Sequence, residues 1–472
     1  MFIGRKRELK SLQNVYDKDG FGMTVIYGRR RIGKSTLIAE FIKNRKSIFY
    51  TATKIGAERN LELFSEQVIS AFDPDASGIV FKSLEAVFDY ITAKLTDEKL
   101  VLVIDELPYW AESDSGLLSV IQKYIDTKWM KSSLMIILCG SSLSFMENKV
   151  LSEKSPVFGR RDSQIKLEAF GYKETALFVP EYSAEDKAIV YGVTGGVAKY
   201  LSMIDAKMTL DDNIKRLFFS SDGYLYDETR NLLTQEFSDI SVVNNIIEQI
   251  ASGANNINVI SGKIHEKETA VLYYLEKLIS TGLVEKKYCI TEEKNRKKTQ
   301  YVLKDHMFKF WYEFVPKAHS VIAIGRGDIY YEKAVKPFLH SFMGSIFEEM
   351  CRSFVLENGV TGEFGCFITN VGTWWGNEKV TDQNGNSEFR TADIDVVGIS
   401  ETDKCAVVGE CKFKNEKIDK SIYETLVRRS ALLSGKYRID KYLFFSLSGF
   451  TEWFDTIDSA NVVLVSLEDM YK

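Results

Sequence analysis

Apolar and polar residues alternate along the first third of the chain as expected for strands separated by helices. Apolar runs stand at 23–28 (MTVIYG), 47–53 (SIFYTAT), 101–107 (VLVIDEL) and 134–142 (LMIILCGSS), and segments between them repeat with helical spacing. Near-continuous apolar runs suit parallel strands that are covered on both faces. We therefore expect residues 1–155 to form an α/β domain with a doubly wound parallel sheet.

The pattern changes several times further along the chain. Residues 156–230 are typical of a small helical lid. Residues 231–310 predict three helices followed by a two-stranded ribbon, which is the order of a winged helix-turn-helix. An aromatic segment leads into a linker helix over 311–339. Residues 340–472 begin with an amphipathic helix and continue with two strands joined by the polar turn ETDK, so we expect a C-terminal α/β domain.

Composition narrows the class of protein. The chain has 472 residues and a net charge of -5, so any contact with nucleic acid must use local basic patches. The N-terminus lacks an apolar signal region and no apolar run is long enough to span a membrane, so we expect a cytoplasmic protein. The six cysteines form no CxxC pair, which predicts free buried thiols and neither a disulfide framework nor a structural zinc site.

The strongest chemical signal follows the first apolar run. The segment GRRRIGKS matches the pattern GxxxxGK[ST] between a strand and a helix, where backbone N–H groups wrap phosphates. Lys34 is expected to reach the β- and γ-phosphates of ATP, and Ser35 to hold Mg²⁺. The residues expected to contact the nucleotide in this loop are Gly28, Arg29, Arg30, Arg31, Ile32, Gly33, Lys34, Ser35 and Thr36.

The run LVLVIDE supplies the partner of this loop. A parallel strand that ends in acid places Asp105 at the carboxyl edge of the sheet, where it can order the ligands of the metal. Glu106 is expected to polarise the attacking water. The next strand ends in Ser141 and Ser142, and two interpretations are open for them: contact with the γ-phosphate or its water, or capping of the following helix.

Two arginines follow at Arg160 and Arg161. One interpretation makes one of them an arginine finger on the nucleotide of a neighbouring subunit, which requires a homo-oligomer. The alternative is a surface salt bridge.

The motifs together resemble a known family. The opening FIGRKREL resembles the FxGRxxEL box of AAA+ and related ATPases, which packs near the adenine and implies nucleotide contacts from Ile3, Gly4 and Arg5. With YGRRRIGKSTL, VIDELPYW, CGSSLSFM, PVFGRR and TGGVAKYL, the first half of the chain resembles the archaeal-type ATPases, which are AAA+/STAND-like P-loop proteins. The resemblance implies binding and hydrolysis of ATP. Ala198 stands where that family usually has proline.

The expected ribbon of the winged helix is basic. A basic wing can grip the phosphates of DNA. The alternative is a solvated, merely charged hairpin, because the expected recognition helix holds few base-reading side chains. The basic residues of the wing are Lys286, Lys287, Lys294, Arg296, Lys297 and Lys298.

The C-terminal part holds a second candidate site. Asp395 lies in the strand ADIDVVG, and Glu410 and Lys412 lie on one face of the next strand because strand side chains alternate. Two carboxylates can hold Mg²⁺, and a lysine beside them can steady phosphate charge. Glu348 or Glu349, on the preceding helix, would complete the set. This D…ExK pattern resembles the PD-(D/E)XK restriction-endonuclease-like fold, and the alternative is a degenerate nuclease fold kept as a scaffold.

Two functions follow from these features. The first is an ATPase coupled to nucleic-acid processing through a metal-dependent nuclease-like C-terminal domain. The second is a regulatory ATPase switch whose winged helix and inactive tail bind a protein partner. The D…ExK residues favour the first, and the acidic overall charge favours the second.

Overall fold

The computed structural model describes the whole chain except residues 1, 77, 293–298, 382–386 and 458. The chain divides into two compact units. The N-terminal unit comprises Met1–Phe170 with Val197–Ser202, and the C-terminal unit comprises Gly171–Gly196 with Met203–Lys472. The finer division into five domains stays a prediction.

The N-terminal unit is built around a five-stranded parallel sheet in the order β2-β3-β4-β1-β5, which confirms the expected α/β class. Its strands are β1 (Gly22–Tyr27), β2 (Ser47–Thr51), β3 (Leu100–Asp105), β4 (Leu134–Gly140) and β5 (Ser163–Lys166). Its helices are α1 (Lys6–Tyr16), α2 (Lys34–Ile42), α3 (Ala57–Phe72), α4 (Leu84–Ala93), α5 (Leu107–Ser113), α6 (Leu117–Tyr124), α7 (Leu143–Phe145) and α10 (Ala198–Leu201).

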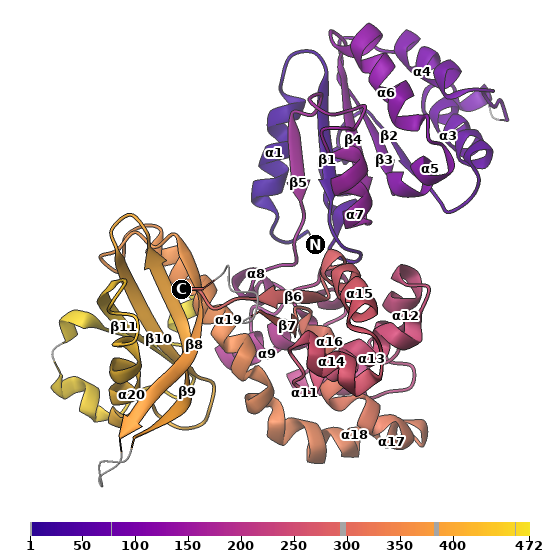
Figure 1. Ribbon diagram of the computed structural model, residues 1–472. Coiled ribbons are helices and arrows are strands. Elements are labelled where there is room, and N and C mark those ends of the chain that lie inside the picture. Colours follow the sequence, from indigo (N-terminus) through magenta and orange to yellow (C-terminus); the bar gives the residue numbers. More distant parts are fainter. Residues whose placement is uncertain (1, 77, 293–298, 382–386, 458) are drawn as a thin grey trace. The chain divides into compact units, whose positions relative to one another are not determined.

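Both faces of this sheet are covered, which explains its continuous apolar strands. In β3, Leu102 and Ile104 belong to one hydrophobic core, to which α3, α4 and α6 contribute. Val101 and Val103 point to the opposite face and join a second core with α1 and α2. Figure 1 shows α1 on one side of the sheet and α3, α4 and α6 on the other. Alternate residues of one strand thus serve two cores, so every position in the strand is apolar.

The first part of the C-terminal unit is mostly helical. Three helices and a two-stranded antiparallel sheet, β6–β7, occur where the sequence predicts them, while the winged-helix interpretation stays a prediction. The elements of this part are α8 (Tyr172–Ala176), α9 (Ala184–Thr194), α11 (Leu210–Phe218), α12 (Glu228–Glu236), α13 (Ile240–Ala251), α14 (Ile257–Ile264), α15 (Glu268–Ser280), β6 (Val284–Lys287), β7 (Gln300–Leu303), α16 (His306–Phe314), α17 (His319–Ala323) and α18 (Gly327–Tyr330).

The second part of this unit contains a mixed five-stranded sheet in the order β12-β11-β10-β9-β8. The first three strands along the chain pair antiparallel, and the last two add in parallel. Figure 1 shows α20 beside this sheet. The elements are α19 (Leu339–Gly359), β8 (Asn370–Thr381), β9 (Ser387–Ser400), β10 (Cys405–Lys412), α20 (Lys420–Ser430), β11 (Arg438–Ser446) and β12 (Val462–Ser466).

The segment after β6 joins the two parts of the C-terminal unit. Cys289 forms a parallel bridge with Thr373 of β8, and the Ile290 N–H donates to the Thr373 carbonyl at 3.0 Å. Both Cys289 and Ile290 lie in the hydrophobic core of the mixed sheet, together with Trp374. Cys289 and Ile290, which form the base of the expected wing, are therefore packed against the C-terminal sheet. Lys294, Arg296, Lys297 and Lys298, which the sequence assigns to the wing, lie outside the described residues.

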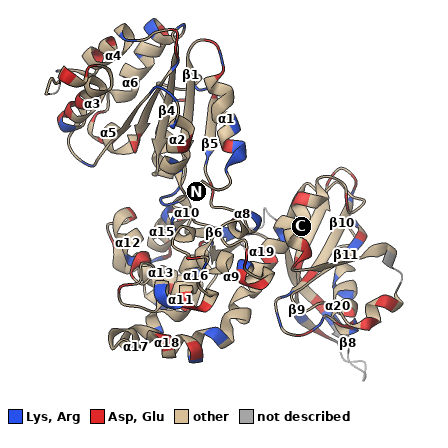
Figure 2. Ribbon diagram, turned by 180° about the vertical axis from the view of Figure 1, so that it is seen from behind, with Lys and Arg blue, Asp and Glu red and all other residues tan. Residues whose placement is uncertain are grey.

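Figure 2 shows acidic and basic residues interleaved along the helices of both units. Across the described part of the chain, no helix combines the length and the apolar character that crossing a membrane requires.

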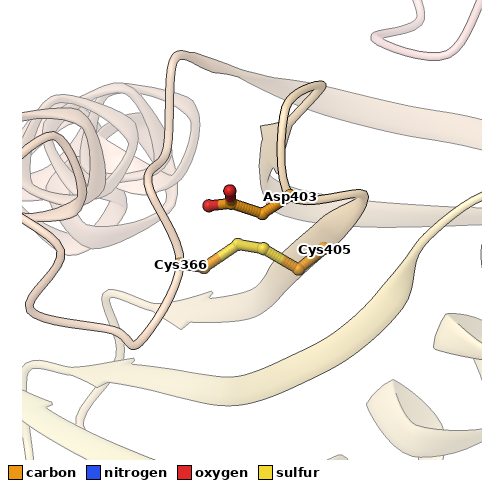
Figure 3. Close-up of side chains that lie close together, drawn as sticks. All are labelled: Cys366, Asp403 and Cys405. Carbon is orange, nitrogen blue, oxygen red and sulfur yellow. A yellow bond between two sulfur atoms is a disulfide. The ribbon is translucent and has the colours of Figure 1, made fainter.

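One cysteine pair departs from the expectation of free thiols. Cys366, in the loop after α19, is bonded to Cys405 at the start of β10, and Asp403 lies beside the bond (Figure 3). The expectation is wrong for these two cysteines. They are 39 residues apart, and the sequence pattern does not show that the chain folds back to bring them together. A disulfide offers no thiolate, so the oxidised pair is not a metal site. The other cysteines are free and buried, as expected: Cys139, Cys289, Cys351 and Cys411.

Closing a loop of this length restricts the unfolded chain. We expect the double variant Cys366→Ser/Cys405→Ser to unfold with a free energy about 2–4 kcal/mol lower, measured by urea denaturation of the full chain. Wild-type protein treated with reductant should match the variant. Thiol titration in denaturant should find the four free cysteines in wild-type protein, and six would contradict the disulfide.

Candidate nucleotide site and carboxylate cluster

The loop between β1 and α2 requires its glycines. A Cβ atom at Gly28 would lie 2.3 Å from the Leu167 carbonyl oxygen, so a side chain there would force the loop away from the sheet. Gly33 has a φ of 92° immediately before α2 begins at Lys34. This left-handed conformation is accessible to glycine at little steric cost. The loop therefore has the turn that the sequence motif predicts at the N-terminus of a helix.

Two distant motifs meet at the carboxyl edge of the parallel sheet. The Ser35 hydroxyl donates to the Asp105 carboxylate at 2.7 Å, and the Glu106 N–H donates to its other oxygen at 3.0 Å. The Lys34 ammonium donates to the Gly28 carbonyl at 2.9 Å and lies inside the loop. Asp105 is only 3% exposed. These contacts bring together residues that are about 70 positions apart, as the parallel strand order requires.

The two serines after β4 have different roles. The Ser141 hydroxyl donates to the Glu106 carboxylate at 2.7 Å, and the Ser141 N–H donates to the same oxygen at 3.2 Å. Ser142 caps α7, because its hydroxyl accepts from the Phe145 N–H at 3.4 Å. Glu106 itself has a positive φ of 51°, a strained conformation for a residue with a side chain. Capping thus belongs to Ser142, and Ser141 orients Glu106.

The FxGRxxEL box at the N-terminus contacts the loop between β1 and α2. Arg5 is buried, and its guanidinium donates to the Glu168 carbonyl at 2.6 Å and to the Ile32 carbonyl at 3.3 Å. It also stacks over the Phe170 ring at 4.0 Å. Gly4, next to it, has a positive φ of 69°. Arg5 therefore positions the phosphate loop through its hydrogen bond to the Ile32 carbonyl.

The candidate arginine fingers have protein partners. Arg160 forms a bidentate salt bridge with Asp126, with both nitrogen–oxygen distances 2.7 Å. This is the alternative that the sequence left open for the pair. Arg161 lies over the Phe158 ring, 5.3 Å from its centroid. A finger role for either residue stays a prediction.

The antiparallel pairing of β9 and β10 assembles the second site. Gly409 pairs with Val396. Because the strands are antiparallel, Glu410, which follows Gly409, is the neighbour of Asp395, which precedes Val396. The Cys411 N–H donates to the Asp395 carboxylate at 3.0 Å. The Lys412 ammonium lies 2.6 Å from the Glu410 carboxylate. The three residues expected to share one site are thus brought together.

Helix α19 supplies the remaining carboxylate. Glu348 and Asp395 interact electrostatically, and Arg352 donates both to Glu348 at 3.3 Å and to the Asp395 carbonyl at 3.0 Å. Glu349 instead lies 3.0 Å from the His306 ring nitrogen. The structure therefore selects Glu348, of the two glutamates that the sequence offers, as the neighbour of Asp395.

The carboxylates of this cluster are held in an unfavourable environment. Burial raises the pKa of Glu410, and the negative charge of Asp395 raises it further, against the opposing effect of Lys412. Burial likewise raises the pKa of Asp395 and of Glu348. Crowded carboxylates need a cation or a proton, and their hard oxygens are the ligands preferred by Mg²⁺ or Mn²⁺. Among the described residues, however, the carboxylate oxygens of Asp395, Glu410 and Glu348 do not all lie within 4.8 Å of one another, so a shared divalent metal would require these side chains to move closer together.

The first site agrees with the match to known proteins. Residues 2–204 match a family described as an ATPase domain predominantly from Archaea. Residues 2–204 belong to this archaeal-type ATPase family. Residues 311–425 match a second family, which is described as archaeal and bacterial proteins of unknown function.

Individual relatives extend this result. An uncharacterised protein of Methanocaldococcus jannaschii is 28% identical over 99% of this chain and 100% of its own length. An uncharacterised ATP-binding protein of the same organism is 41% identical over 10% of this chain and 78% of its own. A solved Walker-type ATPase of Pyrococcus abyssi has a TM-score of 0.50 and 18% identity, and the match covers 66% of this chain and 96% of that one. The last similarity concerns the fold alone.

Two contacts in the archaeal-type ATPase domain escaped the sequence motifs. Arg30 of the loop donates to the hydroxyl group of Tyr109 in α5, and the Lys199 N–H donates to the Arg31 carbonyl at 3.0 Å. Both residues lie in motifs that the sequence analysis names: Tyr109 in VIDELPYW and Lys199 in TGGVAKYL. The motif spacing carries no information about contacts between separate elements, and for this reason it did not reveal them.

The raised pKa of Asp395 leads to a prediction about stability. A raised pKa in the folded state favours the protonated carboxyl, so its stabilising contribution is present at low pH and is lost as the pH rises through that pKa. We expect Asp395→Asn to raise the unfolding temperature at pH 7 by about 2–4 °C, since the amide oxygen still accepts from Cys411. The difference should shrink near about pH 4, where the carboxyl is protonated. Calorimetry checks this, with the exposed Asp455→Asn as control, and a lower melting temperature at pH 7 would contradict it.

Proposed function

We propose that the chain is an ATPase coupled to nucleic-acid processing through metal-dependent cleavage at its C-terminal carboxylate cluster. The proposal of metal-dependent cleavage rests on one observation, the clustering of Asp395, Glu410, Lys412 and Glu348. Buried carboxylates beside a lysine are expensive to keep without a functional reason. The first half rests on the archaeal-type ATPase domain.

In the ATPase half, the loop residues 28–36 hold the phosphates of ATP. Lys34 neutralises the β- and γ-phosphates, and Ser35 with Asp105 holds Mg²⁺. Glu106 polarises the attacking water. Its carboxylate accepts two hydrogen bonds from Ser141, so the serine controls the direction in which Glu106 points. The adenine lies near the box that contains Ile3, Gly4 and Arg5.

In the nuclease half, a bound Mg²⁺ or Mn²⁺ supplies positive charge to the phosphodiester and lowers the pKa of a water molecule. Asp395, Glu410 and Glu348 would be the ligands of this metal. Lys412 faces the same site as Glu410, as their 2.6 Å contact indicates, and it steadies the negative charge that develops on the phosphate.

DNA is the proposed partner of the α13–β7 part. Lys286 and Lys287 belong to the described portion of the expected wing. An arginine finger from Arg160 or Arg161 would act across a homo-oligomer, and Arg160 would first have to leave its salt bridge with Asp126.

A specific observation favours the second candidate function, a regulatory ATPase switch that binds a protein partner. Three apolar side chains on α14 and α15 are exposed: Val259, Leu272 and Tyr273. An exposed apolar surface is more typical of a protein contact than of a contact with DNA phosphates. In addition, Cys289 and Ile290 at the base of the wing are already packed into the mixed sheet.

The first test concerns ATP. We expect Glu106→Gln to keep nucleotide affinity and to slow hydrolysis by about 10²–10⁴-fold, because only the group that polarises water is lost. Lys34→Ala should lose affinity as well as turnover. Nucleotide titration and phosphate release are measured on the same samples. Loss of affinity in Glu106→Gln would show that the glutamate has another role.

The second test concerns the carboxylate cluster. We expect Glu410→Ala and Lys412→Ala each to abolish cleavage of nucleic acid while ATP hydrolysis persists, because the two sites lie in different units. Mn²⁺ titration by calorimetry should show weaker binding in Glu410→Ala. The exposed Glu416→Ala is the matched control. If wild-type protein cleaves neither plasmid, linear DNA nor RNA, and binds metal as Glu410→Ala does, the tail is a scaffold and the switch function is favoured.

A further inference from the structure

A pocket next to the carboxylate cluster lies inside the C-terminal unit. Its volume is about 500 Å³, within the range of small-molecule sites. Residues of α13, β6, β7, α16, α19 and β8 line it. The bridge between Cys289 and Thr373 holds β6 and β8 on two sides of this space. The pocket therefore lies where the segment after β6 meets β8.

The pocket gathers cations from three elements. Lys286 and Lys287 come from β6, Lys309 from α16 and Arg352 from α19. Carboxylates also line it, but they offset these charges incompletely. Glu349 already accepts hydrogen bonds from His306 and from the Tyr191 hydroxyl, at 3.0 and 3.1 Å.

The two other carboxylates of the lining are Glu285 and Glu313. Glu313 is exposed, so water screens its charge. Arg352 is itself paired with Glu348 at 3.3 Å, so the cations that are left to attract an anion in the pocket are Lys286, Lys287 and Lys309.

Lys287 is the most informative of these cations. Its side chain is half-buried, and within the described residues no hydrogen bond or ion pair is recorded for its ammonium group. Burial, and then the nearby charge of Arg352, lower the pKa of Lys287, while the negative charges of Glu348 and Asp395 oppose this shift without a direct contact. A buried cation is unfavourable unless it is paired. An anionic ligand would supply the missing partner.

The remaining lining suits the apolar part of a nucleotide. Tyr301 and Phe342 are buried side chains of the pocket lining, and Val371 lines it as well. An aromatic wall can pack against a base or a sugar. Arg352 also donates to the Asp395 carbonyl at 3.0 Å, so one residue touches both the pocket and the carboxylate cluster.

We propose that this pocket binds the phosphate group of a nucleotide, either free or at the end of a nucleic-acid strand. A phosphate monoester carries nearly two negative charges at neutral pH and offers three acceptor oxygens, which lysines and an arginine from separate elements can share. The proposal does not depend on cleavage at Asp395 and Glu410. It gives Lys286 and Lys287 a role in the pocket.

The test uses the full chain carrying Lys34→Ala, in EDTA, so that the loop at residues 28–36 contributes little and no metal occupies the carboxylates. Thymidine 5′-monophosphate and inorganic phosphate are titrated by calorimetry. We expect Lys287→Met to weaken the binding of both probes by about tenfold or more, since a charge-assisted hydrogen bond is lost. Lys287→Arg should retain binding, and Lys263→Met, which changes an exposed lysine of α14, should bind as the parent does.

A thermal scan separates loss of the ligand from loss of the fold. Lys287→Met should melt at or above the temperature of the parent, because a half-buried charge without a direct partner is removed. Thymidine monophosphate should raise the melting temperature of the parent and not that of Lys287→Met. An oligothymidine with a 5′-phosphate that binds more tightly than the monophosphate would identify a strand end as the source, and the reverse order a free nucleotide.

Several results would overturn the proposal. These are equal binding by the parent and Lys287→Met, equal binding of malonate or of unphosphorylated thymidine, and no heat of binding at millimolar monophosphate. None of them bears on metal binding or cleavage, which are measured with Mn²⁺ present. Failure of the pocket and failure of the nuclease function can therefore be told apart.

Discussion

The hydrogen bond from the Ser35 hydroxyl to the Asp105 carboxylate is the contact on which the ATPase domain depends. It joins the start of α2 to the end of β3, and it forms because both ends lie at the carboxyl edge of one parallel sheet. The sheet itself is stabilised by apolar side chains on both faces. Movement of β3 by one residue would send Asp105 to the opposite side and separate the two motifs.

The carboxylate cluster follows a related rule in a different sheet. There the antiparallel register of β9 and β10 places Asp395 beside Glu410. Helix α19 adds Glu348, which interacts electrostatically with Asp395. Burial raises the pKa of each of these carboxyl groups, so the fold holds them at some expense of stability. Lys412 and Arg352 offset part of this expense through direct contacts. Such an arrangement is typical of functional sites, where charge is kept for chemistry.

The same sheet also links the helical part of the C-terminal unit to the cluster. Cys289 and Ile290 continue from β6 onto β8, and the pocket lined by Lys287 and Arg352 lies at this connection. Arg352 lies between the pocket and Asp395, which it contacts through the backbone carbonyl. A ligand held in the pocket would therefore act directly on a residue that orients the cluster.

The sequence by itself determined the parallel sheet, the phosphate loop at residues 28–36 and the meeting of Asp105 with Ser35, because each depends on local periodicity and on the rule that parallel strands end at one edge. It also determined that Asp395, Glu410 and Lys412 would share a face, since strand side chains alternate. Only the tertiary structure decided between Glu348 and Glu349, which are adjacent on a helix and differ by its rotation.

Tertiary structure alone also paired Ser141 with Glu106, Cys366 with Cys405, and the base of the wing with β8. Each of these contacts joins segments that are far apart along the chain. Local patterns of apolar and polar residues carry no record of which distant segments meet, because that choice is made by the packing of whole elements against one another.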